Sequence, residues 1–146
     1  MGYTHYYRIP AKMKEAKFSK FVADAKKIIK QAEKNGIKLA DGYGEKKGKY
    51  ILTDDLVSFN GLDSDSHETC YIERTEEGVS SDENELVFNF CKTARKPYDE
   101  VVVAVLATLK HHFPKVELSS DGEVSNFVQG EKLVEQALGK KFKFKL

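Results

Sequence analysis

Apolar and polar residues recur with two different periods along this chain, and the periods separate predicted helices from predicted strands. Between residues 15 and 34, apolar residues return every three or four positions, which predicts an amphipathic helix that ends at Asn35-Gly36. A second helix is predicted over 97–113, where Pro97 suits the first turn and the following residues are apolar almost all round. A short third helix is expected to end at Gly139. The second helix should be the most deeply buried.

Short segments rich in β-branched and aromatic residues predict strands before, between and after these helices. The predicted strands are residues 3–9, 37–40, 50–53, 56–60, 68–74, 85–93 and 115–119. The three strands between 50 and 74 are expected to form a meander, and the lysine-apolar alternation of the tail, 140–146, predicts an edge strand. No repeat, low-complexity tract or linker divides the chain, so residues 1–146 are expected to form one domain.

This order of elements predicts an α+β fold: a single-domain, two-layer sandwich with a mostly antiparallel sheet and the helices on one face. Two helices each follow a strand, which indicates a split βαβ core in which strands 3–9 and 85–93 are parallel neighbours. Crossover handedness then places both helices on the same face. Alternation predicts that one row of strand 85–93 packs beneath the helices, namely Leu86, Phe88 and Phe90. The uncovered face would then carry Tyr6, Arg8, Asn89, Cys91 and Thr93.

Composition indicates a folded protein of the cytoplasm, since the 146 residues are 40% hydrophobic and 32% charged. No apolar run approaches the roughly 18 residues of a membrane span, and the N-terminus lacks the pattern of a signal peptide. Two cysteines, Cys70 and Cys91, are too few for a disulfide framework. We therefore expect a cytoplasmic location and no membrane partner.

The net charge of +1 conceals an uneven distribution of charge along the chain. Residues 1–50 hold 13 basic and 5 acidic residues, whereas residues 51–90 hold 1 basic and 11 acidic residues. The basic residues are 21 lysines and only three arginines, although arginine is the side chain best suited to phosphate and base recognition. The acidic middle segment and the scarcity of arginine disfavour general nucleic-acid binding.

The segment 91–99 leads a predicted strand into the second helix through a loop with three basic residues. The free amides and the dipole of a helix N-terminus favour an anion, so the segment predicts a phosphate site. If strands 3–9 and 85–93 are parallel, the loop after the first strand approaches the same edge of the sheet, and Tyr3 and His5 lie at the far end. The predicted ligand-binding residues are Lys92, Arg95, Lys96, Tyr98, Arg8 and Lys12.

Other chemistries find little support in the sequence. The acidic run 63–68 has ligands at alternate positions, but Glu68 stands where a calcium loop needs glycine. Glycine-rich phosphate loops, serine elbows and zinc-ligand spacings are absent. No metal and no cofactor are therefore expected, and neither cysteine has the local signature of a nucleophile.

Three segments of the chain resemble a group of small uncharacterised proteins of bacteriophages and prophages. They are the opening MGYTHY at 1–6, FCKTARKPYD at 90–99 and SSDG at 119–122. The group usually has tryptophan where this chain has Tyr7. The resemblance brings no known activity and implies a viral origin and action in a bacterial cytoplasm.

Three functions remain open at this point. The favoured hypothesis is a non-enzymatic, phage-derived protein that binds a phosphorylated small molecule or nucleotide in the host cytoplasm, as a counter-defence protein would. The first alternative is an inhibitor that binds a host protein through the acidic middle segment or the uncovered sheet face. The second alternative is a small enzyme that uses Cys91 or His5, for which a paired nucleophile and base are missing from the sequence pattern.

Overall fold

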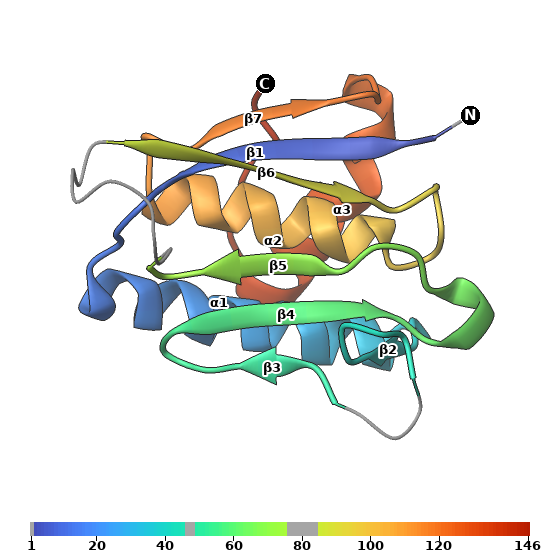
Figure 1. Cartoon of the computed structure of the whole chain (residues 1–146). Helices are drawn as coiled ribbons and strands as arrows, with labels where there is room; N and C mark the ends of the chain where they lie inside the picture. The colour runs from blue at the N-terminus through green and yellow to red at the C-terminus, as the bar shows by residue number, and fades with distance from the viewer. Residues whose placement is uncertain (1, 46–48, 76–84) are drawn as a thin grey trace.

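The computed structural model describes residues 2–45, 49–75 and 85–146 (Figure 1). Its helices and strands follow the predicted order along the chain. They are β1 (Thr4–Pro10), α1 (Glu15–Lys34), β2 (Leu39–Ala40), β3 (Ile51–Leu52), β4 (Leu56–Gly61), β5 (Cys70–Glu73), β6 (Leu86–Lys92), α2 (Asp99–His112), β7 (Glu117–Ser120) and α3 (Val128–Leu138). Short 3-10 turns at Asp63–Asp65 and Val124–Phe127 complete this part of the chain.

The helices confirm the periodicity from which they were predicted. Every apolar residue of the α1 stripe is buried: Phe18, Phe21, Val22, Ala25, Ile28, Ile29 and Ala32. The helix stops where Gly36 adopts a φ of 94°, a left-handed conformation that favours glycine. Helix α2 is buried at every position from Val101 to Leu109, and all three helices contact one another. In Figure 1 they lie together behind the strands.

The strands form two antiparallel sheets, which confirms the α+β class. One sheet has the order β6-β1-β7, with the N-terminal strand in the middle. In the other, β4 is central and pairs with β2, β3 and β5, so the predicted meander is present. The helices pack against these sheets and share one core with them, which includes Tyr7, Phe59 and Leu106.

The split βαβ core is built from different strands than predicted. Strands β1 and β6 are neighbours, but they are antiparallel, so the predicted parallel pairing was wrong. Strands β6 and β7 both run antiparallel to β1 and are therefore parallel to each other, with α2 as their crossover. The prediction failed because the chain leaves α1 for the β4 sheet and returns to β1 only after β5, so no direct crossover fixes the direction of β6.

The two faces of β6 are also the reverse of the prediction. Phe88 and Phe90 are 54% and 53% exposed, whereas Cys91 is buried. Residues opposite each other in an antiparallel pair share a face, and the large buried Tyr7 and Ile9 of β1 face Asn89 and Val87. The core beneath β1 is filled by the large side chains of β1 itself, so β6 contributes its smaller residues and presents its phenylalanines to solvent.

The tail is not the predicted edge strand, since residues 140–146 form no regular element. Its phenylalanines point into the protein instead: Phe142 stacks on His111 with ring centroids 3.9 Å apart, and Phe144 packs on Phe127 at 4.4 Å. The Phe144 amide also donates to a Glu131 carboxylate oxygen at 2.8 Å. Side-chain burial against the helices therefore outweighs the strand-like alternation of this segment.

Candidate functional site

The six predicted ligand-binding residues do not meet at one place. Because β1 is antiparallel to β6, Lys92 lies opposite Thr4, at the start of β1, and Arg8 lies further along, opposite Phe88 and Glu117. Lys12 comes after the end of β1 and bridges to Thr75. Arg8 and Lys12 therefore lie towards the opposite edge of the sheet from Arg95, and their assignment to this site was wrong.

The remaining four residues have structural partners around the start of α2. The Lys96 ammonium donates to the Ser64 carbonyl at 2.9 Å, and the buried Tyr98 hydroxyl donates to the Glu68 carbonyl at 2.6 Å. The Lys92 amide donates to the Glu68 carboxylate at 2.9 Å. These bonds attach the segment before β5 to the loop between β6 and α2. In the first turn of α2, Asp99 and Glu100 already place negative charge at the positive end of the helix dipole.

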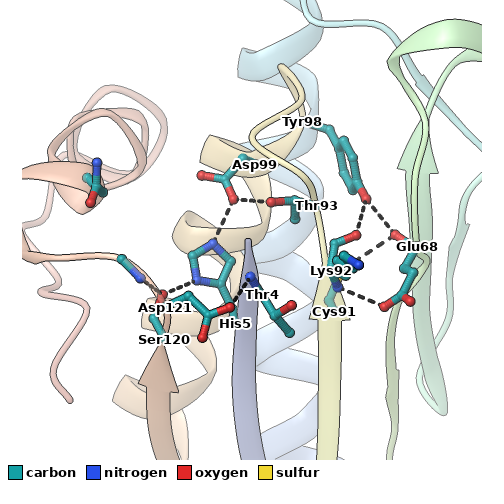
Figure 2. A network of polar contacts seen from close by, with 12 residues as sticks. Thr4, His5, Glu68, Cys91, Lys92, Thr93, Tyr98, Asp99, Ser120 and Asp121 are labelled. Atoms are coloured by element: carbon teal, nitrogen blue, oxygen red, sulfur yellow. Dashed lines mark hydrogen bonds and ion pairs between the residues drawn. The ribbon is translucent and has the colours of Figure 1, made fainter. Parts of the chain in front are cut away.

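A polar network at this sheet edge joins β1, β7 and α2 through His5 (Figure 2). Its Nε2 lies 2.7 Å from Asp99 Oδ1, and its Nδ1 lies 2.8 Å from Ser120 Oγ. Asp99 Oδ1 also accepts the hydroxyl of Thr93, and Ser120 Oγ accepts the amide of Gly122 at 2.9 Å. The antiparallel register brings the network together, because it places His5 opposite both Cys91 and Ser120.

The proton positions in this network follow from the groups that surround His5. Asp99 as a carboxylate only accepts, so His5 Nε2 carries a proton and donates it. Nδ1 of a neutral ring is then an acceptor, and Ser120 is free to donate its hydroxyl proton because its oxygen already accepts from Gly122. The His5 side chain is 0% exposed and lies among the rings of Tyr3, Phe127 and Phe144. A low-dielectric surrounding of this kind strengthens each polar contact of the imidazole.

Tyr3 and Arg95 extend the network towards solvent. The Arg95 guanidinium lies 3.9 Å from the centre of the Tyr3 ring, and it is held there by a loop in which Ala94 and Arg95 have φ values of 51° and 59°. The Tyr3 hydroxyl is buried beside Gly122 and Ser120 and has no aligned hydrogen-bond partner within the described residues. Burial and Asp99 raise the pKa of Tyr3, while Arg95 and the nearby Ser120 act in the opposite direction.

An aromatic face covers the outer side of the β6-β1-β7 sheet and is defined here as Tyr6, Phe88 and Phe90. The rings of Tyr6 and Phe88 stack with centroids 6.1 Å apart, and those of Phe88 and Phe90 lie 6.0 Å apart. The Tyr6 hydroxyl donates to Asp121 at 3.1 Å, which fixes that ring. A hollow of about 220 Å³ lies beside the rings, between Phe88 and Glu117. An apolar patch of this kind on a regular strand is a candidate interaction surface.

The cysteines are poorly placed for nucleophilic chemistry. Both are buried, and the Cys91 thiol contacts the Glu68 carbonyl at 3.4 Å. The neighbouring Cys70 and burial raise the pKa of Cys91 well above its usual value, so this sulfur stays a thiol at neutral pH. Cys91 therefore lacks the thiolate form that an enzyme with a cysteine nucleophile would need.

Sequence reasoning included the loop 92–98 in the site but placed Tyr3 and His5 at the wrong end. The sequence did contain one indication of this network, namely His5. Alternation puts His5 in the same row as Tyr3, Tyr7 and Ile9, and a histidine in a buried apolar row needs hydrogen-bond partners. Asp99 and Ser120 supply them, and Thr93 donates to Asp99. The three segments that carry the resemblance, 2–6, 90–99 and 119–122, all contribute to this sheet edge.

Comparisons with protein-family models, with curated proteins and with solved structures found no match to this chain. Across residues 2–45, 49–75 and 85–146, no three side chains of His, Cys, Asp or Glu are grouped as metal ligands would be. Within the same ranges, none of the helices has both the length and the apolar character needed to cross a bilayer.

Proposed function

We propose that this chain is a protein-binding module whose partner docks on the aromatic face. The observation that carries the proposal is the half-exposure of Phe88 and Phe90 on a well-formed strand, where the fold gains nothing from their contact with water. The first alternative of the sequence analysis, a host-protein inhibitor acting through the uncovered sheet face, corresponds to this function. The resemblance to phage and prophage proteins implies a bacterial host protein as the partner.

The apolar area available on the face is sufficient for the centre of an interface. An aromatic side chain buries about 150–250 Å² when it is fully enclosed, so two half-exposed phenylalanines offer about 200 Å². At ~25 cal/mol per Å², covering them contributes about 5 kcal/mol. A pair of neighbouring rings with this contribution is typical of the few residues that dominate binding energy. The surrounding polar residues would form the rim.

The charged residues beside the face are of both signs. Glu117 and Arg8 both line the hollow beside Phe88, and Asp121 accepts a hydrogen bond from Tyr6. An exposed aromatic sheet also suits base stacking, but the chain has only three arginines with which to hold a phosphate backbone, so a protein is the better partner.

The phosphorylated-ligand hypothesis has weaker support in the geometry. Of its six residues, Arg8 and Lys12 lie towards the opposite edge of the sheet. Lys96 and Tyr98 donate hydrogen bonds to carbonyl groups of the segment before β5. Arg95 and Lys92 remain at the helix start, where Asp99 and Glu100 supply the negative charge. A ligand with one or two phosphates would have to compete with these carboxylates.

The test compares the wild type with Phe88→Ser/Phe90→Ser in affinity capture from a bacterial lysate, quantified by mass spectrometry. Tyr43→Ser is the matched control, because Tyr43 is 86% exposed and lies outside the aromatic face. The captured protein is then purified and titrated by calorimetry. We expect the double variant to lose the partner and the control to retain it.

Two results would reject this function. The first is equal recovery of the same proteins by the double variant, with its secondary structure intact by circular dichroism. The second is that the wild type captures single-stranded nucleic acid and the double variant does not, while both capture the same proteins. Stabilisation of the wild type by nucleotides, lost in Arg95→Ala/Lys96→Ala, would return the phosphorylated-ligand hypothesis to first place.

A further inference from the structure

Ser120, His5 and Asp99 form a chain of hydrogen bonds with the roles of a nucleophile, a base and a group that orients the base. The two links of the chain measure 2.8 Å from Ser120 Oγ to Nδ1 and 2.7 Å from Nε2 to Asp99 Oδ1. Serine hydrolases are recognised by this set of roles rather than by residue order or fold. Here Ser120 faces Nδ1 and Asp99 faces Nε2, and the imidazole connects the two groups in either orientation.

The three groups differ in burial. His5 is fully enclosed, the Asp99 side chain is 17% exposed, and Ser120 at the end of β7 is partly exposed. The base is therefore the member of the chain that is shielded from water. Thr93 gives Asp99 a second donor, which holds the carboxylate in place for the imidazole.

The buried hydroxyl of Tyr3 also lies beside Ser120. The Tyr3 hydroxyl is buried in a residue that is only 3% exposed, and it has no aligned hydrogen-bond partner within the described residues. It lies so close to Gly122 that a Cβ at that position would be 2.2 Å from the hydroxyl oxygen. A buried polar group without a partner is uncommon in a folded protein and calls for an explanation. The oxyanion that develops on the ester carbonyl oxygen when Ser120 attacks would provide the missing acceptor.

Arg95 indicates the class of substrate. It is exposed and stacks on the ring of Tyr3, whose neighbours also include Ser120. Two consecutive non-glycine residues with positive φ, Ala94 and Arg95, hold the guanidinium in this position, and backbone strain of this kind clusters at ligand-binding sites. A guanidinium beside a nucleophile favours a substrate with a carboxylate or phosphate group.

We propose that Ser120 is the nucleophile of an acyl-transfer site for anionic carboxylic esters, with His5 as the base. Ser120 Oγ bonds to the ester carbonyl carbon, its proton passes to His5 Nδ1, and the bond from that carbon to the leaving oxygen breaks. The leaving alkoxide takes the proton from His5. Water then attacks the acyl-serine by the same route, so that the acid is released and Ser120 regains its proton. Asp99 is a positioning residue, since it acts through His5.

The experiment exposes the full chain to a fluorophosphonate, which phosphonylates an activated serine oxygen with loss of fluoride, and locates the adduct by peptide mass spectrometry. We expect labelling of Ser120 in the wild type and none in Ser120→Ala. Asp99→Asn should react at least about 100-fold more slowly, because the imidazole is no longer held in the required tautomer. Ser119→Ala is the matched control, since Ser119 is the exposed neighbour on the other face of β7 and should label like the wild type.

The same preparation tests the substrate class with mono-p-nitrophenyl succinate, an anionic ester, and p-nitrophenyl acetate, a neutral one. The wild type should prefer the anionic ester, and Arg95→Gln should lower the rate with that ester more than with acetate. Failure of the folded wild type to label at Ser120 would overturn the proposal by itself. So would an equal labelling rate in an Asp99→Asn variant whose circular dichroism matches the wild type.

Discussion

Two buried tyrosines on the same row of β1 should respond with opposite signs to loss of the hydroxyl group. Tyr3 is 3% exposed and Tyr7 is 1% exposed, and both rings belong to the inner face of the strand. The Tyr3 hydroxyl has no hydrogen-bond partner within the described residues, whereas the Tyr7 hydroxyl donates to the Tyr71 carbonyl at 2.8 Å. Replacement by phenylalanine keeps each ring and removes only the oxygen.

The expected magnitudes follow from the two environments. A buried hydroxyl without a partner costs about 1–3 kcal/mol, so Tyr3→Phe should raise the free energy of unfolding by about 1–2 kcal/mol. The stacking of Arg95 on the ring survives this change. A satisfied hydrogen bond contributes about 1 kcal/mol, so Tyr7→Phe should lower stability by at least that amount. For a chain of this length, each 1 kcal/mol corresponds to about 2–4 °C in Tm.

Urea titrations and thermal melts of the wild type and both variants, at pH 7 and under identical conditions, measure the difference directly. Tyr3→Phe should melt higher and Tyr7→Phe lower than the wild type. Tyr3→Phe should also label more slowly at Ser120 if its hydroxyl supports an oxyanion. A Tyr3→Phe variant that is less stable than the wild type would show that the Tyr3 hydroxyl is hydrogen-bonded in solution and is not an unpaired donor.

Three further predictions concern a carboxyl, a glycine and the cysteines. Burial and Asp99 raise the pKa of Glu100, so ionisation of this carboxyl opposes folding. Glu100→Gln should therefore increase stability at pH 7, and its advantage should shrink towards pH 4, where the wild-type carboxyl is protonated; a pH-independent difference would contradict this. A Cβ at Gly130 would lie 2.6 Å from Val103 Cβ and 2.9 Å from the Glu100 carbonyl oxygen, so Gly130→Ala should force α2 and α3 apart. In urea titrations it should lower the free energy of unfolding by about 2 kcal/mol, whereas Gln129→Ala at an exposed position should lower it by less than about 0.5 kcal/mol. Ellman's reagent should modify neither Cys70 nor Cys91 in the native protein and both in urea, because both thiols are buried; rapid reaction of the native protein would contradict their placement.

The elements of this fold were largely predictable because each is encoded locally. The α1 stripe, the glycine stops at 36 and 139 and the apolar α2 each depend on residues close together in sequence. The tail was mispredicted because its alternation fits a strand as well as a segment that buries every second side chain against helices. Local pattern does not distinguish the two.

The site was only partly predictable because it depends on strand direction. The loop 92–98 was identified from its own basic residues, but its true neighbours come from residues 3–5 and 120–122, which pairing alone brings there. Choosing the parallel pairing moved Arg8 and Lys12 into the site and His5 out of it. The faces of β6 were predicted from its apolar row alone, whereas the observed register places Phe88 and Phe90 on the same face as Tyr6 and Arg8.

The position of β1 between β6 and β7 also constrains when the protein can fold. Strand β1 is synthesised well before its partners, which begin at Leu86 and end at Ser120. At about 5–20 residues per second, the roughly 80 residues between β1 and the end of β6 take about 4–16 s to synthesise. During that interval the aromatic β1 is an unpaired strand, open to chaperones or to other nascent chains. Helix α1 and the meander can form meanwhile, and the sheet edge that carries Ser120 is completed only after β7 has been made.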